Sequence, residues 1–119
     1  MQEPITVPRI VSAADTEWRD HPRFAGIQIK PLLTRADNEW ANVSLVQVPP
    51  GGEVGWHVHP TQVETVYLLA GKAILTIGAN ASPMTAGCIV AIPARAEHSL
   101  RNVGSENIEL IAFFTPPNS

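Results

Sequence analysis

Short segments with alternating apolar and polar side chains run through the sequence, and clusters of glycine, proline and asparagine separate them. Alternation with a period of two residues predicts strands that bury one face. The segments are residues 24–33, 40–48, 63–70, 72–77, 88–92, 98–103 and 108–114, with a further strand after Pro49-Pro50-Gly51-Gly52. Strands of this length, divided by turn residues, are typical of an antiparallel sandwich or barrel. The sequence therefore predicts an all-β fold in one domain.

The other segments are predicted to form turns and terminal extensions. Residues 78–83 have the composition of a turn. We expect residues 1–23 to form an N-terminal arm with one or two short strands, or a single helical turn over residues 12–18. This arm would pack on the barrel or on a partner subunit, with Trp18 as its anchor. Residues 24–115 are the predicted barrel, and residues 116–119 are a polar tail.

Three side chains that can bind a metal ion lie close together in an otherwise largely apolar stretch. His57 and His59 are two residues apart and project from the same face of a strand. Residues 60–62 can turn the chain, so that the next strand returns Glu64 beside the two histidines. A buried carboxylate and two unpaired imidazoles would be costly, and a divalent cation that coordinates all three removes that cost.

A fourth ligand is expected elsewhere in the chain, which contains four histidines. His21 lies in a polar segment with flanking arginines and a proline, and this segment is predicted to be an exposed loop. His98 lies at the edge of an apolar strand, and we expect it to complete the set. A lone buried histidine is more often a core residue than a ligand. The prediction therefore depends on the combined spacing of the four residues.

These residues carry a resemblance to the small single-domain cupins. The first cupin motif is glycine, five residues, His-x-His, three or four residues, glutamate, six residues and glycine, and residues 51–71 match it from Gly51 to Gly71. The second motif is matched by Gly87, Pro93, His98 and Asn102. The resemblance implies an antiparallel double-stranded β-helix, or jelly-roll barrel, with metal ligands His57, His59, Glu64 and His98.

One position departs from the second motif, because Arg95 stands where the family has glycine. If this turn requires a positive φ, the arginine strains it by roughly 1 kcal/mol; otherwise the turn has another shape. The departure affects a loop and not a ligand. Asn102 is expected to make a structural hydrogen bond at the end of its strand rather than to bind metal.

Composition narrows the classes of partner. The net charge is −3, with 8 basic and 11 acidic residues, and no cluster of lysine or arginine is present. This argues against nucleic acid and against an anionic membrane surface, and leaves small-molecule ligands. The single cysteine, Cys88, excludes an internal disulfide, and no basic-then-apolar leader follows Met1. We therefore expect a cytoplasmic protein.

Several other side chains are weaker candidates for the site. Gln62 could orient a substrate or face solvent, and Gln62 and Glu64 are the only catalytic candidates. Cys88 could be a nucleophile or a ligand, but its apolar neighbours favour a buried, unreactive thiol. Tyr67 has the strand parity opposite to Glu64 and is expected to face outward. Arg95 and Glu97, which are close to His98 in sequence, are candidates for the rim of the metal site. Four apolar residues could line a pocket, although core packing is the default for each: Trp40, Trp56, Met84 and Phe113.

The ligand set predicts one divalent transition metal ion, and iron, manganese, nickel, cobalt, copper and zinc all suit it. Two open positions on an octahedral ion would allow catalysis. Cupins with all four ligands resemble dioxygenases above all, with isomerases, decarboxylases and cyclases also represented, so we predict a metal-dependent enzyme with a small organic substrate. The alternative is a non-catalytic cupin that binds or senses a small molecule or a sugar. The family resemblance also implies a homodimer through the N-terminal arm.

Overall fold

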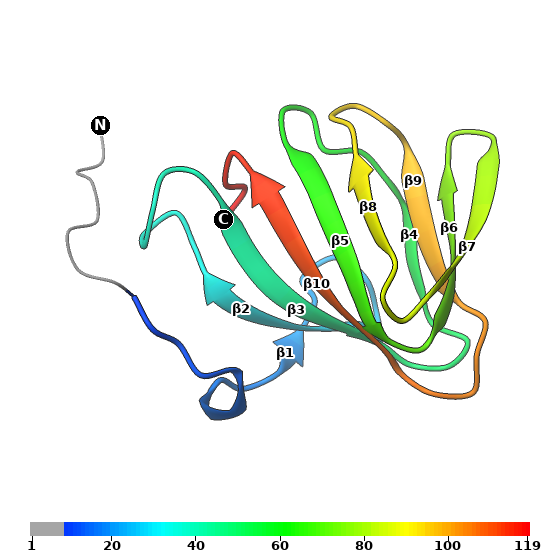
Figure 1. Cartoon of the computed structure of the whole chain (residues 1–119), viewed down its shortest axis with the longest axis horizontal. Coiled ribbons are helices and arrows are strands. Elements are labelled where there is room, and N and C mark those ends of the chain that lie inside the picture. Colours follow the sequence, from blue (N-terminus) through cyan, green and yellow to red (C-terminus); the bar gives the residue numbers. More distant parts are fainter. Residues whose placement is uncertain (1–8) are drawn as a thin grey trace.

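A computed structural model describes residues 9–119, and within them the fold is a sandwich of two antiparallel sheets (Figure 1). One sheet has six strands in the order β1-β2-β3-β10-β5-β8, and the other has four in the order β4-β9-β6-β7. The six-stranded sheet contains β1 (Arg19–Asp20), β2 (Gln28–Leu33), β3 (Asn42–Val48), β5 (Val63–Ala70), β8 (Ile89–Ile92) and β10 (Ile108–Thr115). The four-stranded sheet contains β4 (Glu53–His57), β6 (Lys72–Ile77), β7 (Asn80–Thr85) and β9 (His98–Asn102). The predicted all-β jelly-roll architecture is confirmed.

Side chains from the inner faces of both sheets form the core. Leu68 on β5, Leu75 on β6 and Leu110 on β10 are buried, as are Val48 and Ile108. Strand parity places these residues between the sheets and their sequence neighbours outside. Tyr67 accordingly faces outward, as its position in the alternation predicts.

The prediction of a turn over residues 78–83 was wrong, because most of this segment is strand β7. β7 pairs with β6 from Lys72 opposite Thr85 to Ile77 opposite Asn80, so the turn between them is short. Pro83 lies within β7, which is an edge strand of its sheet. An edge strand tolerates proline because one side of the strand donates no hydrogen bonds to a neighbour.

The described part of the N-terminal arm packs along β2, and its short strand β1 pairs with β2. It contains a 3-10 turn, η1 (Ala13–Asp15), and the short strand β1. The Lys30 ammonium donates a hydrogen bond to the Ala13 carbonyl at 2.7 Å and lies 4.9 Å from the centre of the Trp18 ring. A buried lysine is costly unless it is paired, and these two contacts supply its partners. Residues 1–8 of the predicted arm lie outside the described residues.

The loop that contains Arg95 requires a positive φ at this residue, which is the strained one of the two predicted alternatives. Arg95 has a φ of 67°, and it is the one non-glycine residue with a positive φ in residues 9–119. Its backbone N–H donates to the His59 carbonyl at 2.8 Å. The loop between β8 and β9 is therefore tied to the loop between β4 and β5.

Within residues 9–119, no helix has the length and apolar character needed to cross a membrane.

Candidate metal site and cavity

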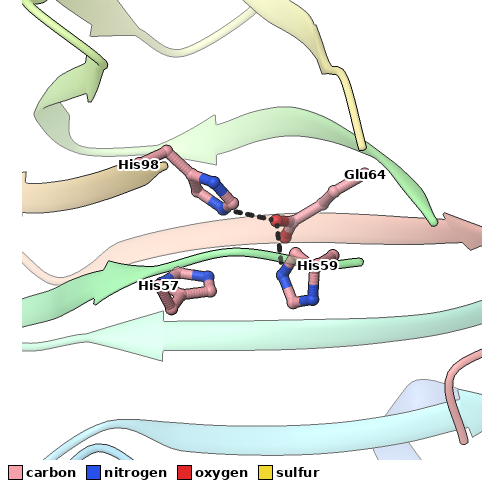
Figure 2. A group of neighbouring side chains, drawn as sticks. All are labelled: His57, His59, Glu64 and His98. Carbon is pink, nitrogen blue, oxygen red and sulfur yellow. Dashed lines mark hydrogen bonds and ion pairs between the residues drawn. The ribbon is translucent and has the colours of Figure 1, made fainter. Parts of the chain in front are cut away.

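The structure brings together His57, His59, Glu64 and His98 between the two sheets (Figure 2). One ligand atom from each residue lies within 4.8 Å of the corresponding atoms of the other three. His57 ends β4 and His98 begins β9, and the two are register partners across the four-stranded sheet. Glu64 reaches the site from β5 in the other sheet, and His59 comes from the loop that connects β4 to β5.

Backbone carbonyls orient two of the imidazoles. Nδ1 of His57 lies 2.7 Å from the Gly55 carbonyl oxygen, and Nδ1 of His98 lies 2.9 Å from that of Ala96. In the neutral rings Nδ1 therefore carries the proton and donates it, which leaves a lone pair on Nε2. A carbonyl that holds Nδ1–H is a usual partner for a histidine that binds metal through Nε2.

Glu64 lies between two histidines, and its charge depends on them. Its Oε1 atom is 3.1 Å from His98 Nε2 and 3.4 Å from His59 Nε2, and Figure 2 marks both contacts. Burial has the largest effect and opposes ionisation of this carboxyl, but the polar contacts and charges of His59 and His98 outweigh burial and lower its pKa to about 2. Glu64 is therefore an anion at neutral pH.

The histidine pKa values shift in opposite directions. Burial is the main effect at His57 and lowers its pKa, so this ring is neutral at physiological pH. Burial also opposes protonation of His98, but the hydrogen bonds with Glu64 and with the Ala96 carbonyl prevail and raise its pKa. The cluster without a cation thus contains one carboxylate that shares its contacts with two imidazoles.

These residues fit a divalent metal ion. His59 Nε2 is buried, and its contact with Glu64 lacks hydrogen-bond geometry, so among the described residues it has no hydrogen-bond partner. A buried nitrogen without a partner costs about 1–3 kcal/mol, and a bound cation would provide that partner. Three imidazole nitrogens and one carboxylate oxygen are donors that suit first-row divalent ions. The four residues could therefore hold such an ion.

The four side chains line a cavity of about 270 Å³ between the sheets. Most of the remaining lining is apolar and comes from both sheets and from the loop before β2: Phe24, Ile29, Val46, Val54, Val66, Leu75, Ile92, Leu100, Leu110, Ala112 and Phe114. Polar side chains of Asn42 and Ser44 also line it, together with Arg23 and residues of the C-terminal tail. The cavity is mainly apolar, with a polar cluster of potential metal ligands.

His21 was predicted to be in an exposed loop, and the structure corrects this. His21 is partly buried and lines the same cavity, as do the next three residues. Its ring centre is 5.1 Å from that of Phe24, which is in turn 5.2 Å from that of His57. The loop over residues 21–24 leads from β1 to β2, and only the folded chain brings it beside β4.

The apolar candidates for the pocket were mostly wrong. Trp40 is 74% exposed and Trp56 is 50% exposed, so neither packs in the core. Phe113 faces outward, and it is Phe114 that lines the cavity and lies 4.8 Å from the His59 ring centre. Met84 is buried, but it lies away from this cavity.

The remaining candidates also lie outside the cavity lining. Gln62 is partly buried, while Arg95 and Glu97 are exposed. Cys88 is partly buried, and its Sγ atom is 3.9 Å from Thr85 Oγ1.

Asn102 is buried and makes the structural contacts expected of it. Its side-chain N–H groups donate to the carbonyls of Val48 and Glu106, and its Oδ1 accepts from the Gly104 N–H. Asn42 and Ser44 were not predicted to line the site, because the more apolar pair on β3, Val43 and Leu45, lies on the opposite face of the strand.

Comparison with known proteins agrees with this geometry. The model of the cupin domain family matches residues 44–114. The chain belongs to the cupin family. This cupin is 30% identical over 67 residues to an oxalate-binding protein of Thermotoga maritima, an alignment that covers 56% of this chain and 55% of that protein. It is 26% identical over 113 residues to the polyketide synthase CurC of Streptomyces cyaneus, and this alignment covers 92% of this chain and 70% of that protein.

A solved structure has the same fold as this cupin. The crystal structure of a predicted oxalate decarboxylase from Thermotoga maritima superposes with a TM-score of 0.82 and 22% sequence identity. The superposition covers 91% of this chain and 99% of that one. The likeness shows that the two chains share one fold.

Proposed function

We propose that this cupin is a metal-dependent enzyme that acts on a small organic substrate with an apolar body and a metal-binding oxygen. The observation that supports the proposal is the joint lining of one cavity by four potential ligands and a largely apolar wall. A cavity with a few convergent polar groups in an apolar lining is the usual form of a small-molecule site.

The chain's own residues supply binding and orientation. His57, His59, Glu64 and His98 would hold the ion, and the carbonyls of Gly55 and Ala96 would keep two of the imidazoles in the correct tautomer. A bound divalent ion supplies Lewis acidity and, if it is redox-active, the means to activate dioxygen. The apolar wall would exclude water from the substrate and position its hydrocarbon part against this cluster.

The lining favours a neutral or weakly charged substrate over a small dianion. Arg23 is the only arginine or lysine that lines the cavity in residues 9–119. A dicarboxylate such as oxalate would lose its hydration and gain little compensating charge beyond the ion itself. A larger, mostly apolar oxygen-bearing compound, the class to which polyketides belong, matches the wall better. We therefore favour a substrate of the second kind and propose dioxygenase-like chemistry on it.

The first experiment measures metal content and oxygen consumption. We expect the purified protein to contain about one equivalent of a divalent metal, and an oxygen electrode to show turnover with at least one enediol, catechol, flavonol or 1,3-diketone. His57→Ala should abolish turnover, and Glu64→Gln should lose most of the metal. Glu53→Gln is the matched control, because Glu53 is an exposed glutamate on β4. Equal metal content in Glu64→Gln and Glu53→Gln would refute the proposal.

A second candidate function is non-catalytic binding of a small molecule. It is favoured by the scarcity of acid–base groups, because His21 is the one titratable side chain of the described cavity lining, other than the four ligands and Arg23. The similar Thermotoga maritima protein is itself described as oxalate-binding. Metal-loaded protein that binds a compound of the panel and returns it unchanged, with and without dioxygen, would support this function over catalysis.

A further inference from the structure

The loop over residues 21–24 places a second, separate polar group in the cavity. Phe24 lies between the His21 ring and the His57 ring, with centre-to-centre distances of 5.1 Å and 5.2 Å. His21 is thus one aromatic ring away from the ligand cluster. The guanidinium of Arg23 lies 5.4 Å from the Phe24 ring centre and helps to hold this ring in place.

The loop backbone determines the tautomer of His21. Its Nδ1 atom accepts hydrogen bonds from the backbone N–H groups of Arg23 at 3.0 Å and of Phe24 at 3.3 Å. An imidazole nitrogen that accepts cannot also carry a proton, so the neutral ring is protonated at Nε2. Burial and then the neighbouring Arg23 charge lower the pKa of His21 and outweigh the opposing effect of the Glu64 charge, which favours this neutral form.

The loop backbone forms hydrogen bonds with Nδ1 of His21 and leaves its Nε2–H group free to donate elsewhere. Residues 9–119 offer it no hydrogen-bond partner, whereas the side chain lines the cavity. A donor at the cavity wall favours a compound whose oxygen takes the place of the water that otherwise accepts from it, because an apolar group at the same position displaces that water without replacing the hydrogen bond.

We propose that His21 is a specificity-determining residue whose Nε2–H donates a hydrogen bond to an oxygen of the substrate at the end remote from the metal ligands. The inference deepens the proposed function and rests on it. The substrate then has oxygen at both ends of an apolar body: one end binds the metal, and the other presents a carbonyl, ether or phenolic oxygen to His21. A single neutral hydrogen bond of this kind contributes about a three- to tenfold preference.

The test uses zinc-loaded protein, because zinc does not change oxidation state and binding can be measured without turnover. The probes are 2,3-dihydroxynaphthalenes with an acetyl or an ethyl group at position 5 or 6. The two hydroxyl oxygens are the metal-binding end, and the acetyl and ethyl groups differ mainly in the distal carbonyl. Calorimetry gives the acetyl-to-ethyl affinity ratio for the wild type and for His21→Asn. The effect of acetyl on the acidity of the hydroxyl groups is the same in both proteins and cancels.

His21→Asn is the informative variant because asparagine keeps the loop. Its side-chain oxygen can accept from the N–H groups two and three residues later, as Nδ1 of His21 does, and its shorter side chain keeps its own NH2 group short of the position of the Nε2–H group. We expect the affinity ratio to fall three- to tenfold in this variant for at least one isomer pair, with the ethyl compounds bound about equally by both proteins. Equal affinity ratios in the two proteins for both isomer pairs would overturn the assignment of His21 and leave the proposed function standing. Zinc-loaded wild type that binds none of the four compounds would count against the proposed function itself.

A second measurement needs neither metal nor ligand. Nitrogen-15 NMR of the metal-free protein reports which ring nitrogen of each histidine is protonated. At pH 7.5 we expect His21 to show the Nε2–H tautomer in the wild type, in contrast to the Nδ1–H tautomer of His57. An Nδ1–H tautomer for His21 would overturn the inference, whatever the binding data.

Discussion

Replacement of Arg95 by glycine is expected to stabilise the protein. Arg95 has a φ of 67°, and its side chain is exposed. A left-handed conformation costs an L-residue roughly 1–2 kcal/mol, whereas glycine adopts it freely. Glycine gives back about 0.5–1 kcal/mol through the larger entropy of its unfolded chain. The net gain in the free energy of unfolding is therefore about 0.5–1 kcal/mol.

Thermal unfolding of the metal-free protein measures this gain. An unfolding entropy of about 0.25 kcal/mol/K for a chain of this length converts it to a rise in Tm of about 2–4 °C. Arg95→Ala is the matched control, since it removes the same exposed side chain but keeps a Cβ at a positive φ. The backbone N–H that donates to the His59 carbonyl is present in every variant. A Tm of Arg95→Gly at or below that of Arg95→Ala would refute the strain argument.

Three further predictions concern backbone contacts, buried hydrogen bonds and pH. Gly71→Ala should lower the free energy of unfolding, measured by urea unfolding, by more than about 2 kcal/mol, and Gly78→Ala should lower it by only about 1 kcal/mol. Both glycines have a positive φ, but only a Cβ at Gly71 would meet backbone atoms, at 2.9 Å from Asn107 O and Ile108 Cα. Similar losses in the two variants would contradict this reasoning. Asn102→Ala should cost about 2–4 kcal/mol by the same assay, because it leaves the buried carbonyl of Val48 and the Gly104 N–H without their partner, and unchanged stability would show that water replaces the side chain. In metal-free protein, Glu64 has a folded-state pKa of about 2 against an ordinary 4.5, so its contribution to stability is present above pH 4.5 and lost as the pH falls toward 2. The raised pKa of His98 adds stability below its ordinary 6.5 that is lost as the pH rises through the folded-state value. The Tm difference between wild type and Glu64→Gln should therefore be largest between pH 4.5 and 6.5, and a difference that grows steadily up to pH 9 would contradict the pairing.

Local patterns in the sequence were enough to predict most strands and the closeness of three of the four ligands, whereas His98, 34 residues after Glu64, was predicted by elimination among the histidines and from the second cupin motif. His57 ends β4, His59 lies in the short loop that follows, and Glu64 lies near the start of β5. Their closeness depends on short-range spacing along the chain. The predicted segments 63–70 and 72–77 coincide with β5 and β6 for the same reason.

Parity alone does not say which face of a strand is inside. On β3, Val43 and Leu45 are the more apolar pair, yet the inner face carries Asn42 and Ser44. The pairing of β3 with β10 fixes this choice, because Val48 lies opposite Ile108 and both are buried. Once Val48 points inward, every second residue back along the strand must do the same. The polar part of the cavity wall therefore follows from pairing between distant segments.

The sequence by itself determined the all-β class and the alternation of faces, because both depend on spacing along a few residues, and it predicted the four potential ligands through their match to two family motifs. Only the tertiary structure decided that His21 lines the cavity, that Trp40 is exposed and that Phe114 rather than Phe113 faces His59. These outcomes depend on strand register and on where loops meet distant strands. Such contacts are selected by the packing of the whole chain, and no local pattern encodes them.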